Sequence, residues 1–370
     1  MKRALAIAVS VGLTVLSTCV SNALAWSSKE HIQLTRIAIE RLLNDPTTPA
    51  SMKEWLRATP TLGSMDAEKQ YLLDTPVGRA PDPKALNLAG LTWWCVVPDI
   101  EAERKDGPKI PPFDQHERFN HYLDMEVFSP ADKPKDYRDD LSAKAGFNDI
   151  PRDFHDPRYL QAGYLPLATE HCYQELVRSI RARKLHADPV KEGDTDHADR
   201  WAGYLAHYIE DNTQPLHATI DYKSKSYFPH DRTPPNVHAE MEYKLVDESA
   251  LPLRSLRTDY WTAFTTSLEL GQDPILATDI FELSVRTSIM SYDALPLIGH
   301  AAVASNHAPI TAPSTAPSTP LTFDTESFYR FRGKMRDVEL SVYEMKAIQQ
   351  AIAVKHVERV LRQAWDEASK

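Results

Sequence analysis

The sequence contains little glycine and little cysteine, and it has no excess of basic residues. Only 12 of its 370 residues are glycine, which excludes collagen-like and glycine-rich disordered classes for most of the chain. The formal net charge is −10, so no basic footprint for nucleic acid or an anionic membrane is visible. The 42% of hydrophobic and 25% of charged residues are typical of a soluble globular protein with one large domain or two small ones.

Long apolar runs are also lacking, except at the N-terminus. Lys2 and Arg3 precede an apolar run over residues 4–16, and a small-residue site follows at 23–25. This order predicts a secretory signal peptide over residues 1–25 and export to the periplasm or the medium. A membrane anchor is the alternative, but the run is shorter than the roughly 20 residues that a spanning helix needs.

The three cysteines leave two alternatives open. Cys19 lies in a poor lipoprotein-like site, and lipidation there would leave Trp26 internal rather than at the new N-terminus. The mature chain would keep Cys95 and Cys172. Because exported proteins meet an oxidising environment, these two residues are consistent with one disulfide, and nearly as well with two buried thiols.

The rest of the chain has the pattern of an all-α protein. Apolar residues recur at near-helical spacing over residues 29–44, 165–185, 198–212, 258–271, 276–292 and 335–368. No convincing run of alternating strand residues is present. Proline-rich intervals predict loops over residues 76–84, 107–114 and 129–136. We therefore expect a single multi-helix domain over 26–307, a Pro/Ser/Thr-rich linker over 308–322, and a C-terminal helical segment over 323–370 that packs on the same domain.

Histidines placed beside carboxylates indicate a metal site. His207 and Asp211 are four residues apart, so on a helix both lie on one face. Pro215 then ends or kinks this helix, which can turn His217 back towards the same cavity. Imidazole nitrogens and carboxylate oxygens are ordinary zinc ligands.

A second pair with the same spacing, His238 and Glu242, follows in a segment that can be helical. One such pair is usually a surface contact on a helix, which contributes about 0.2–0.5 kcal/mol. Two pairs and a further histidine supply more ligands than one zinc needs.

Further candidate ligands lie upstream and are weaker when each is taken alone. They are His31, Asp99 and His121, with Asp124 as a rival carboxylate. We expect the other histidines to be surface, packing or loop residues: His116, His155, His171, His186, His197, His230, His300, His307 and His356.

Taken in order, these residues resemble the zinc-dependent phospholipase C and single-strand-specific nuclease superfamily. That family's mature chain begins with Trp, followed shortly by His, as Trp26 and His31 do here. An Asp, a His, a His-x3-Asp-x5-His block with Gln-Pro before its last histidine, and a His-x3-Asp/Glu pair follow. The corresponding residues here are Asp99, His121, His207/Asp211/His217 with Gln214-Pro215, and His238/Glu242. The motifs span residues 26–242, more than half of the chain.

The resemblance implies an all-helical fold around a cleft that holds three zinc ions. By analogy, one zinc would be held by Asp99, His121, His207 and Asp211, and a second by His217, His238 and Glu242. The third would be held by the free amine and carbonyl of Trp26 with His31 and Asp211, so that Asp211 bridges two ions. A free α-amine has a pKa of about 7.7–8.0 and can deprotonate to bind metal, and at Trp26 it exists only after signal removal.

The activity that the resemblance implies is in-line hydrolysis of a phosphodiester. Clustered zinc ions lower the pKa of bound water to about 7 and stabilise the attacking and leaving oxygens. Asp99 and Asp211 are the expected catalytic residues, with Asp99 as a hypothetical general base. Three zinc ions outweigh the carboxylates of Asp99, Asp211 and Glu242, so the site would attract phosphate even in an acidic protein.

The segment between the last two metal blocks bears on the substrate. Nuclease members usually carry Gly-Gly-Asn there, whereas residues 218–237 contain no glycine. Glu242 ends the final pair, as in the phospholipase branch, so we expect a phospholipid substrate and transient contact with a membrane surface. A single-strand-specific nuclease or 3'-nucleotidase is the alternative, because Asn236-Val237-His238 resembles that branch's Asn-Leu-His. The second alternative is a non-catalytic exported zinc-binding protein. We infer no protein partner and expect a monomer.

Overall fold

The protein is mostly helical, as the sequence predicts. The computed structural model describes residues 26–59, 90–103, 109–110, 115–128, 150–191, 193–228, 234–246, 253–307 and 322–370. The predicted signal peptide, the predicted loops over 76–84 and 129–136, and nearly all of the predicted linker lie outside the described residues.

The five predicted helices before the C-terminal segment correspond to the longer helices of the structure. These are α1 (Ser28–Asn44), α8 (Leu165–Arg181), α9 (Ala198–Asn212), α11 (Arg254–Leu270) and α12 (Ile280–Tyr292). Shorter helical elements are α2 (Ala50–Ala58), α5 (Leu91–Trp94), α6 (Val97–Glu103), η1 (Glu117–Asn120), η2 (Met125–Phe128), α7 (Tyr159–Ala162), η4 (Pro215–Ala218), η5 (Lys225–Tyr227), α10 (Val237–Ala239), η6 (Glu240–Lys244), α13 (Leu295–Ala304) and α14 (Thr325–Arg330).

The predicted helix over 335–368 is wrong over its first residues. The helix α15 begins only at Val342 and ends at Ala368, and a hairpin of β5 (Arg332–Met335) and β6 (Val338–Ser341) precedes it. Arg336 in the turn has a φ of 54°, a left-handed conformation that interrupts a helix. Ser341 and Glu344 then form a capping box, which satisfies the first amide groups of α15.

Two further antiparallel pairs were not predicted. One joins β1 (Lys109–Ile110) to β2 (Gln115–His116), so part of the predicted loop over 107–114 is a strand. The other joins β3 (Asn306–His307) to β4 (Thr322–Phe323) and brings the two ends of the predicted linker together. Each strand has two residues, which is too short to give an alternating pattern in the sequence.

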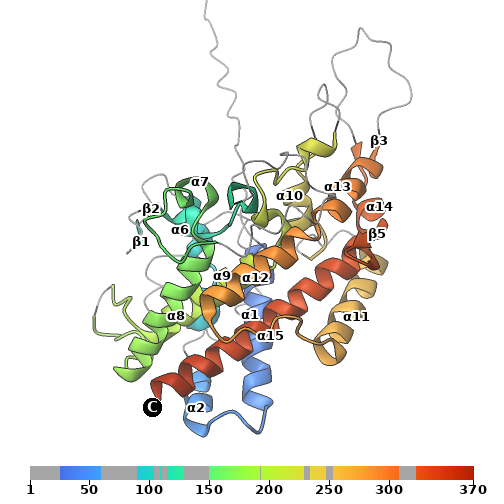
Figure 1. Cartoon of the computed structure of the whole chain (residues 1–370). Helices are drawn as coiled ribbons and strands as arrows, with labels where there is room; N and C mark the ends of the chain where they lie inside the picture. Colours follow the sequence, from blue (N-terminus) through green and yellow to red (C-terminus); the bar gives the residue numbers. More distant parts are fainter. Residues whose placement is uncertain are drawn as a thin grey trace, which may run out of the picture.

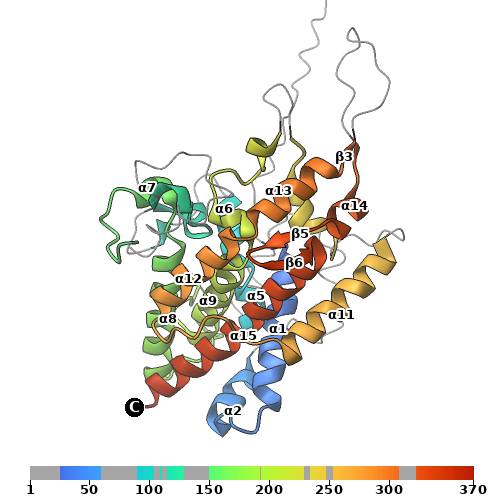
Figure 2. The same cartoon turned by 45° about the vertical axis from the view of Figure 1, so that its right-hand side comes forward.

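Four of the long helices, α1, α8, α12 and α15, pack around α9. Helix α15 contacts α1, α8, α9 and α11, while α8 and α12 also pack against α9 and against each other. Figures 1 and 2 show α15, in red, running beside α1 and α11. Every residue of α9 except Arg200 is buried, as expected for a helix surrounded by others. The side chains that α9 carries therefore lie inside the protein.

Cys95 and Cys172 are both buried, and no disulfide joins them. Of the two alternatives that the sequence leaves open, the structure has the two buried thiols. The Cys95 Sγ donates to the Thr92 carbonyl, which lies three residues earlier. Within the part of the chain that is described, no helix combines the length and apolar composition needed to cross a bilayer.

Gly203 allows α5 and α9 to approach each other closely. A Cβ atom on Gly203 would lie 2.4 Å from the Trp94 Cβ and 2.8 Å from the Cys95 backbone nitrogen. Both neighbours belong to the segment that also contacts His207, so this approach positions a candidate ligand as well as the core.

We predict that Gly203→Ala destabilises the protein. In an open helix this change would stabilise by roughly 0.5–1 kcal/mol, but here overpacking against backbone lowers the free energy of unfolding by about 1–3 kcal/mol. Urea denaturation measures the change. Gln174→Ala on the exposed face of α8 is the control and should alter stability by less than about 0.5 kcal/mol. Equal stability of both variants would contradict the close approach.

Candidate metal centre

The structure brings all eight predicted side-chain ligands into three buried clusters. The first cluster consists of His31, His207 and Asp211. The second consists of Asp99, His121 and His207, and the third of His217, His238 and Glu242. Within each cluster the potential ligand atoms all lie within 4.8 Å of one another. Each cluster could therefore hold a metal ion.

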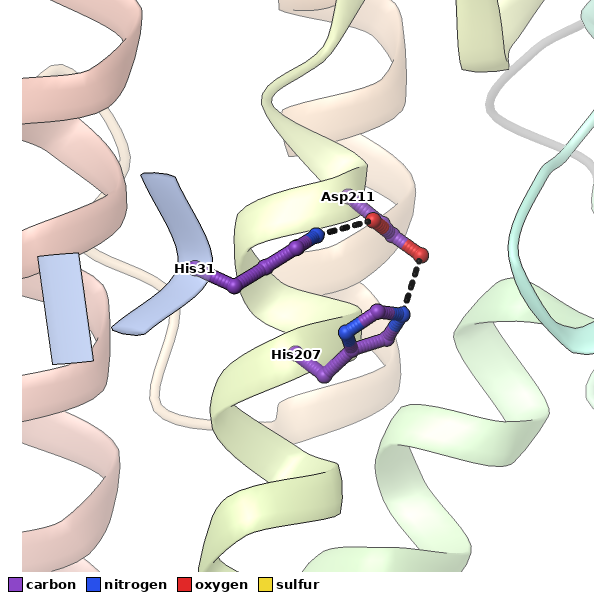
Figure 3. Close-up of side chains that lie close together, drawn as sticks. All are labelled: His31, His207 and Asp211. Atoms are coloured by element: carbon purple, nitrogen blue, oxygen red, sulfur yellow. Dashed lines mark ion pairs between the residues drawn. The ribbon is translucent and has the colours of Figure 1, made fainter. Parts of the chain in front are cut away.

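The first cluster lies between α1 and α9. His207 and Asp211 are one helical turn apart on α9, and His31 reaches them from the first turns of α1 (Figure 3). Asp211 lies between the two imidazoles. Its Oδ1 is 3.4 Å from the His31 Nε2, and its Oδ2 is 3.2 Å from the His207 Nε2.

The second cluster shares His207 with the first and adjoins the same carboxylate. Asp99 comes from α6, and His121 follows η1 directly. The His121 Nδ1 lies 3.0 Å from the Asp211 Oδ2 and 3.7 Å from the Asp99 Oδ1. The two oxygens of Asp211 thus face different clusters, which is the arrangement that a bridging ligand requires.

The third cluster forms where the chain turns after α9. Gln214 caps η4, Pro215 occupies its first turn, and His217 is placed in that same turn. His238 on α10 and Glu242 on the π-helical turn η6 complete the cluster. The His238 Nε2 lies 2.5 Å from the Glu242 Oε1, and the His217 Nε2 lies 3.8 Å from the same oxygen.

The ring nitrogens of two histidines are oriented by backbone carbonyls. The His207 Nδ1 donates to the Cys95 carbonyl at 2.7 Å, and the His217 Nδ1 donates to the His121 carbonyl at 2.6 Å. A carbonyl only accepts, so in the neutral imidazole the lone pair resides on Nε2. Each of these Nε2 atoms faces another imidazole nitrogen at 3.1 Å, from His121 and His238 respectively. Two imidazole nitrogens at this distance need either a proton or a metal ion between them, so both pairs fit a cation.

Buried atoms at the centre of the clusters support the same interpretation. The His31 Nε2, the Asp211 Oδ1 and the Glu242 Oε1 are buried and lie close to other ligand atoms, but none of these contacts has the geometry of a hydrogen bond within the described residues. Such atoms are rare in native proteins and require a physical reason. A metal ion at the first cluster and another at the third would supply the missing interactions, so the residues present fit a metal centre.

Burial keeps several of the imidazoles neutral. It lowers the pKa of His31 to about 3 and that of His121 to about 4, and it also lowers the pKa of His238. The neutral imidazole is the form that binds metal. Burial acts the same way on His207, but the carboxylates of Asp211 and Asp99 outweigh it and raise its pKa to about 9.

The carboxylates respond to the same surroundings. Burial opposes ionisation of Asp211, yet the facing His207 and the hydrogen bond with His121 hold its pKa well below the ordinary value. Burial raises the pKa of Glu242 well above the ordinary value, and the charges of Asp99 and Asp211 add to this effect. A cation among these groups would favour both ionised carboxylates.

One partner of the centre was missed in the sequence. The Glu210 Oε2 lies 2.6 Å from the His31 Nδ1, and Thr35 donates to the Glu210 Oε1 at 2.8 Å. The carboxylate therefore orients the ring of His31, as carboxylates commonly do for metal-binding histidines. The available signal was an acidic residue directly before Asp211 on a helix that is otherwise mostly apolar.

The remaining sequence candidates are placed as follows. Trp26 is fully buried, and its indole nitrogen donates to the Thr213 Oγ1 at 3.2 Å. Ligation by its amine and carbonyl stays a prediction. The rival Asp124 belongs to none of the three clusters, and its backbone nitrogen donates to the Ala162 carbonyl.

Histidines that were assigned to other roles lie outside these clusters. His186 pairs with Asp199, and His356 pairs with Asp273. His230 lies outside the described residues.

No family model matches this chain, and no curated protein matches it as a relative. The resemblance to the phospholipase and nuclease superfamily therefore rests on the motif residues alone. The structure independently supports the coarser statement that three buried groups of His, Asp and Glu could hold metal ions.

We predict that Asp99→Asn removes one metal equivalent. The amide keeps the size of the side chain but loses the charge, so the second cluster would bind zinc poorly. Metal content after dialysis, measured by elemental analysis, tests this. Asp124→Asn is the matched control and should retain the full content. Loss of zinc from the control, with Asp99→Asn unchanged, would identify Asp124 as the ligand instead.

We predict that Glu210→Gln weakens zinc retention at the first cluster by about 10–100-fold. A glutamine has one acceptor oxygen in place of two, so it cannot accept from both the His31 Nδ1 and the Thr35 hydroxyl. Competition with a chromogenic chelator measures the affinity. Glu40→Gln, on the exposed face of the same α1, should behave like the unmodified protein. If both variants release zinc alike, Glu210 has no part in holding the metal.

Proposed function

We propose that this protein is an exported, zinc-dependent phosphodiester hydrolase. The observation that carries the proposal is the position of Asp211, whose Oδ1 faces His31 and whose Oδ2 faces His121 and His207. In the proposal the three clusters hold three zinc ions, with the amine and carbonyl of Trp26 completing the first one. Cleavage of the signal peptide after residue 25 would create that amine. The active form would be a monomer.

Zinc in such a centre acts as a Lewis acid for phosphoryl oxygens and lowers the pKa of water. The roles of the protein groups follow from their positions. Asp99 lies 3.6 Å from the His207 Nε2 and 3.7 Å from the His121 Nδ1, so it is placed to accept a proton at the edge of the second cluster. Asp211, held between His31 and His207, keeps the first and second clusters together.

We propose a phospholipid as the preferred substrate. The segment after His217 carries Ile220 and Tyr222, which are 57% and 38% exposed. The ring of Tyr222 lies edge-on to the candidate ligand His238, with 5.7 Å between the ring centroids. Exposed apolar side chains in a segment that packs on a candidate ligand are suited to a substrate presented at a lipid surface, with which contact would be transient.

Cleavage of single-stranded nucleic acid is the second candidate activity, and the same tyrosine favours it. Lys223 lies 5.3 Å from the centroid of the Tyr222 ring, and an aromatic ring beside a basic group can stack a base and attract a phosphate. A third candidate is exported zinc binding without turnover. A protein with this role would keep the three clusters and would need no substrate.

A paired assay tests the proposal. Zinc-loaded protein that begins at Trp26 is offered phosphatidylcholine vesicles and single-stranded DNA, each with and without a zinc chelator. We expect diacylglycerol release that the chelator abolishes and that Asp99→Asn lowers by about 10²–10⁴-fold. Chelator-sensitive DNA cleavage instead would reverse the substrate assignment. Zinc loading without turnover of either substrate would contradict the enzymatic proposal.

A further inference from the structure

A buried lysine connects the C-terminal helix with the metal centre. Lys346 on α15 is fully buried, with an exposed fraction of 0%. Its ammonium group lies 2.6 Å from the Glu30 Oε1 and donates to the Met241 carbonyl. It also lies 4.8 Å above the ring of Trp26. Nothing in the proposed chemistry uses this charge, because the group cannot reach a substrate.

The partners of Lys346 belong to two segments that carry candidate ligands. Glu30 directly precedes His31 of the first cluster, and Met241 directly precedes Glu242 of the third. These two segments lie about two hundred residues apart in the sequence, on either side of α9 in chain order. The Lys346 ammonium group therefore contacts one residue beside the first cluster and one residue beside the third. These two contacts fix the separation between the two segments.

Glu30 extends this connection to the start of the chain after signal removal. Its second oxygen, Oε2, accepts from the Ser27 backbone nitrogen at 3.3 Å, as part of the capping box of α1. The Glu30 carboxylate thus lies between Lys346 and the residue that follows Trp26. A second link from the C-terminal segment reaches the same turn η6, where the buried Tyr329 hydroxyl donates to the Glu240 carbonyl at 2.7 Å.

A buried lysine is costly even when it is paired, and an apolar side chain of similar length is often as stable. Packing alone therefore does not account for this residue. A charge with fixed partners does specify one arrangement of those partners, which an apolar side chain does not. The geometry points to that role here.

We propose that Lys346 is a positioning residue for the metal centre, which sets the separation between the first and third clusters. The proposal rests on the proposed function, in which these clusters hold zinc. It makes the helix over Val342–Ala368 a part of the site, although all of the candidate ligands lie before it.

The test is zinc stoichiometry and retention in Lys346→Met, with Lys355→Met as the matched control. Lys355 is nine residues further along α15, and its ammonium group donates to the carbonyls of Ser267 and Gly271 at the end of α11. Both variants remove one cation from the same helix, but only the first is connected to the clusters.

We expect Lys346→Met to lose two of three zinc equivalents, or to release them at least 10-fold more readily to a chelator. Lys355→Met should keep all three, whatever its melting temperature. Equal zinc retention in the two variants would overturn the proposal. Wild-type protein that binds no zinc would instead refute the proposed function on which this inference rests.

A second variant covers the case in which Lys346→Met does not fold. Glu30→Gln keeps the lysine and changes only its carboxylate partner, so it should also weaken zinc retention. Where Lys346→Met does fold, the loss in the double variant should be smaller than the sum of the two single losses, because both changes break the Lys346–Glu30 pair. Additive losses, or full retention in Glu30→Gln, would contradict the pairing as the cause.

Discussion

The structure depends on one buried carboxylate, Asp211, placed inside a helix bundle. Helix α9 is covered by α8, α12 and α15, so water cannot solvate this charge. A buried charge persists only when it is paired, and imidazoles from His31, His121 and His207 surround it. They come from α1, from the segment after η1 and from α9 itself. The packing of these elements therefore also fixes the positions of the candidate ligands.

Contacts on the far side of the ring orient three of the five candidate imidazoles. Glu210 holds His31, the Cys95 carbonyl holds His207, and the His121 carbonyl holds His217. His121 is central here, because its ring belongs to the second cluster while its carbonyl orients a ring of the third. A small displacement of this one residue would reach two clusters. Gly203 acts at the same point, since it allows the Cys95 carbonyl to lie near α9.

The sequence predicted contacts between residues that lie close together in the chain, and it missed contacts between distant segments. His207 with Asp211 and His238 with Glu242 are local pairs at helical spacing, so their approach follows from the chain itself. The motif order indicated Asp99 over Asp124, and the structure places Asp99 in a cluster. The contacts of Lys346 with Glu30 and Met241 join distant segments and leave no periodic signal. The hairpin before α15 was missed because the apolar spacing continues through it, while the left-handed Arg336 turn does not show in that spacing.

The candidate metal ligands and the residues that we propose to contact substrate lie in different segments. The candidate ligands lie on helices of the core, whereas Tyr222 belongs to a short segment after η4 that both ends hold in place. Glu126 accepts from the Thr219 hydroxyl and from the Ile220 backbone nitrogen at one end. At the other end Tyr227 packs on Gly299, where any Cβ would meet its ring. Because such a segment can change its side chains without moving the clusters, the metal centre that we propose would be compatible with either a lipid or a nucleic-acid phosphodiester. The specificity of the hydrolase that we propose would then be decided by residues 219–228, and the chemistry by α9 and its neighbours.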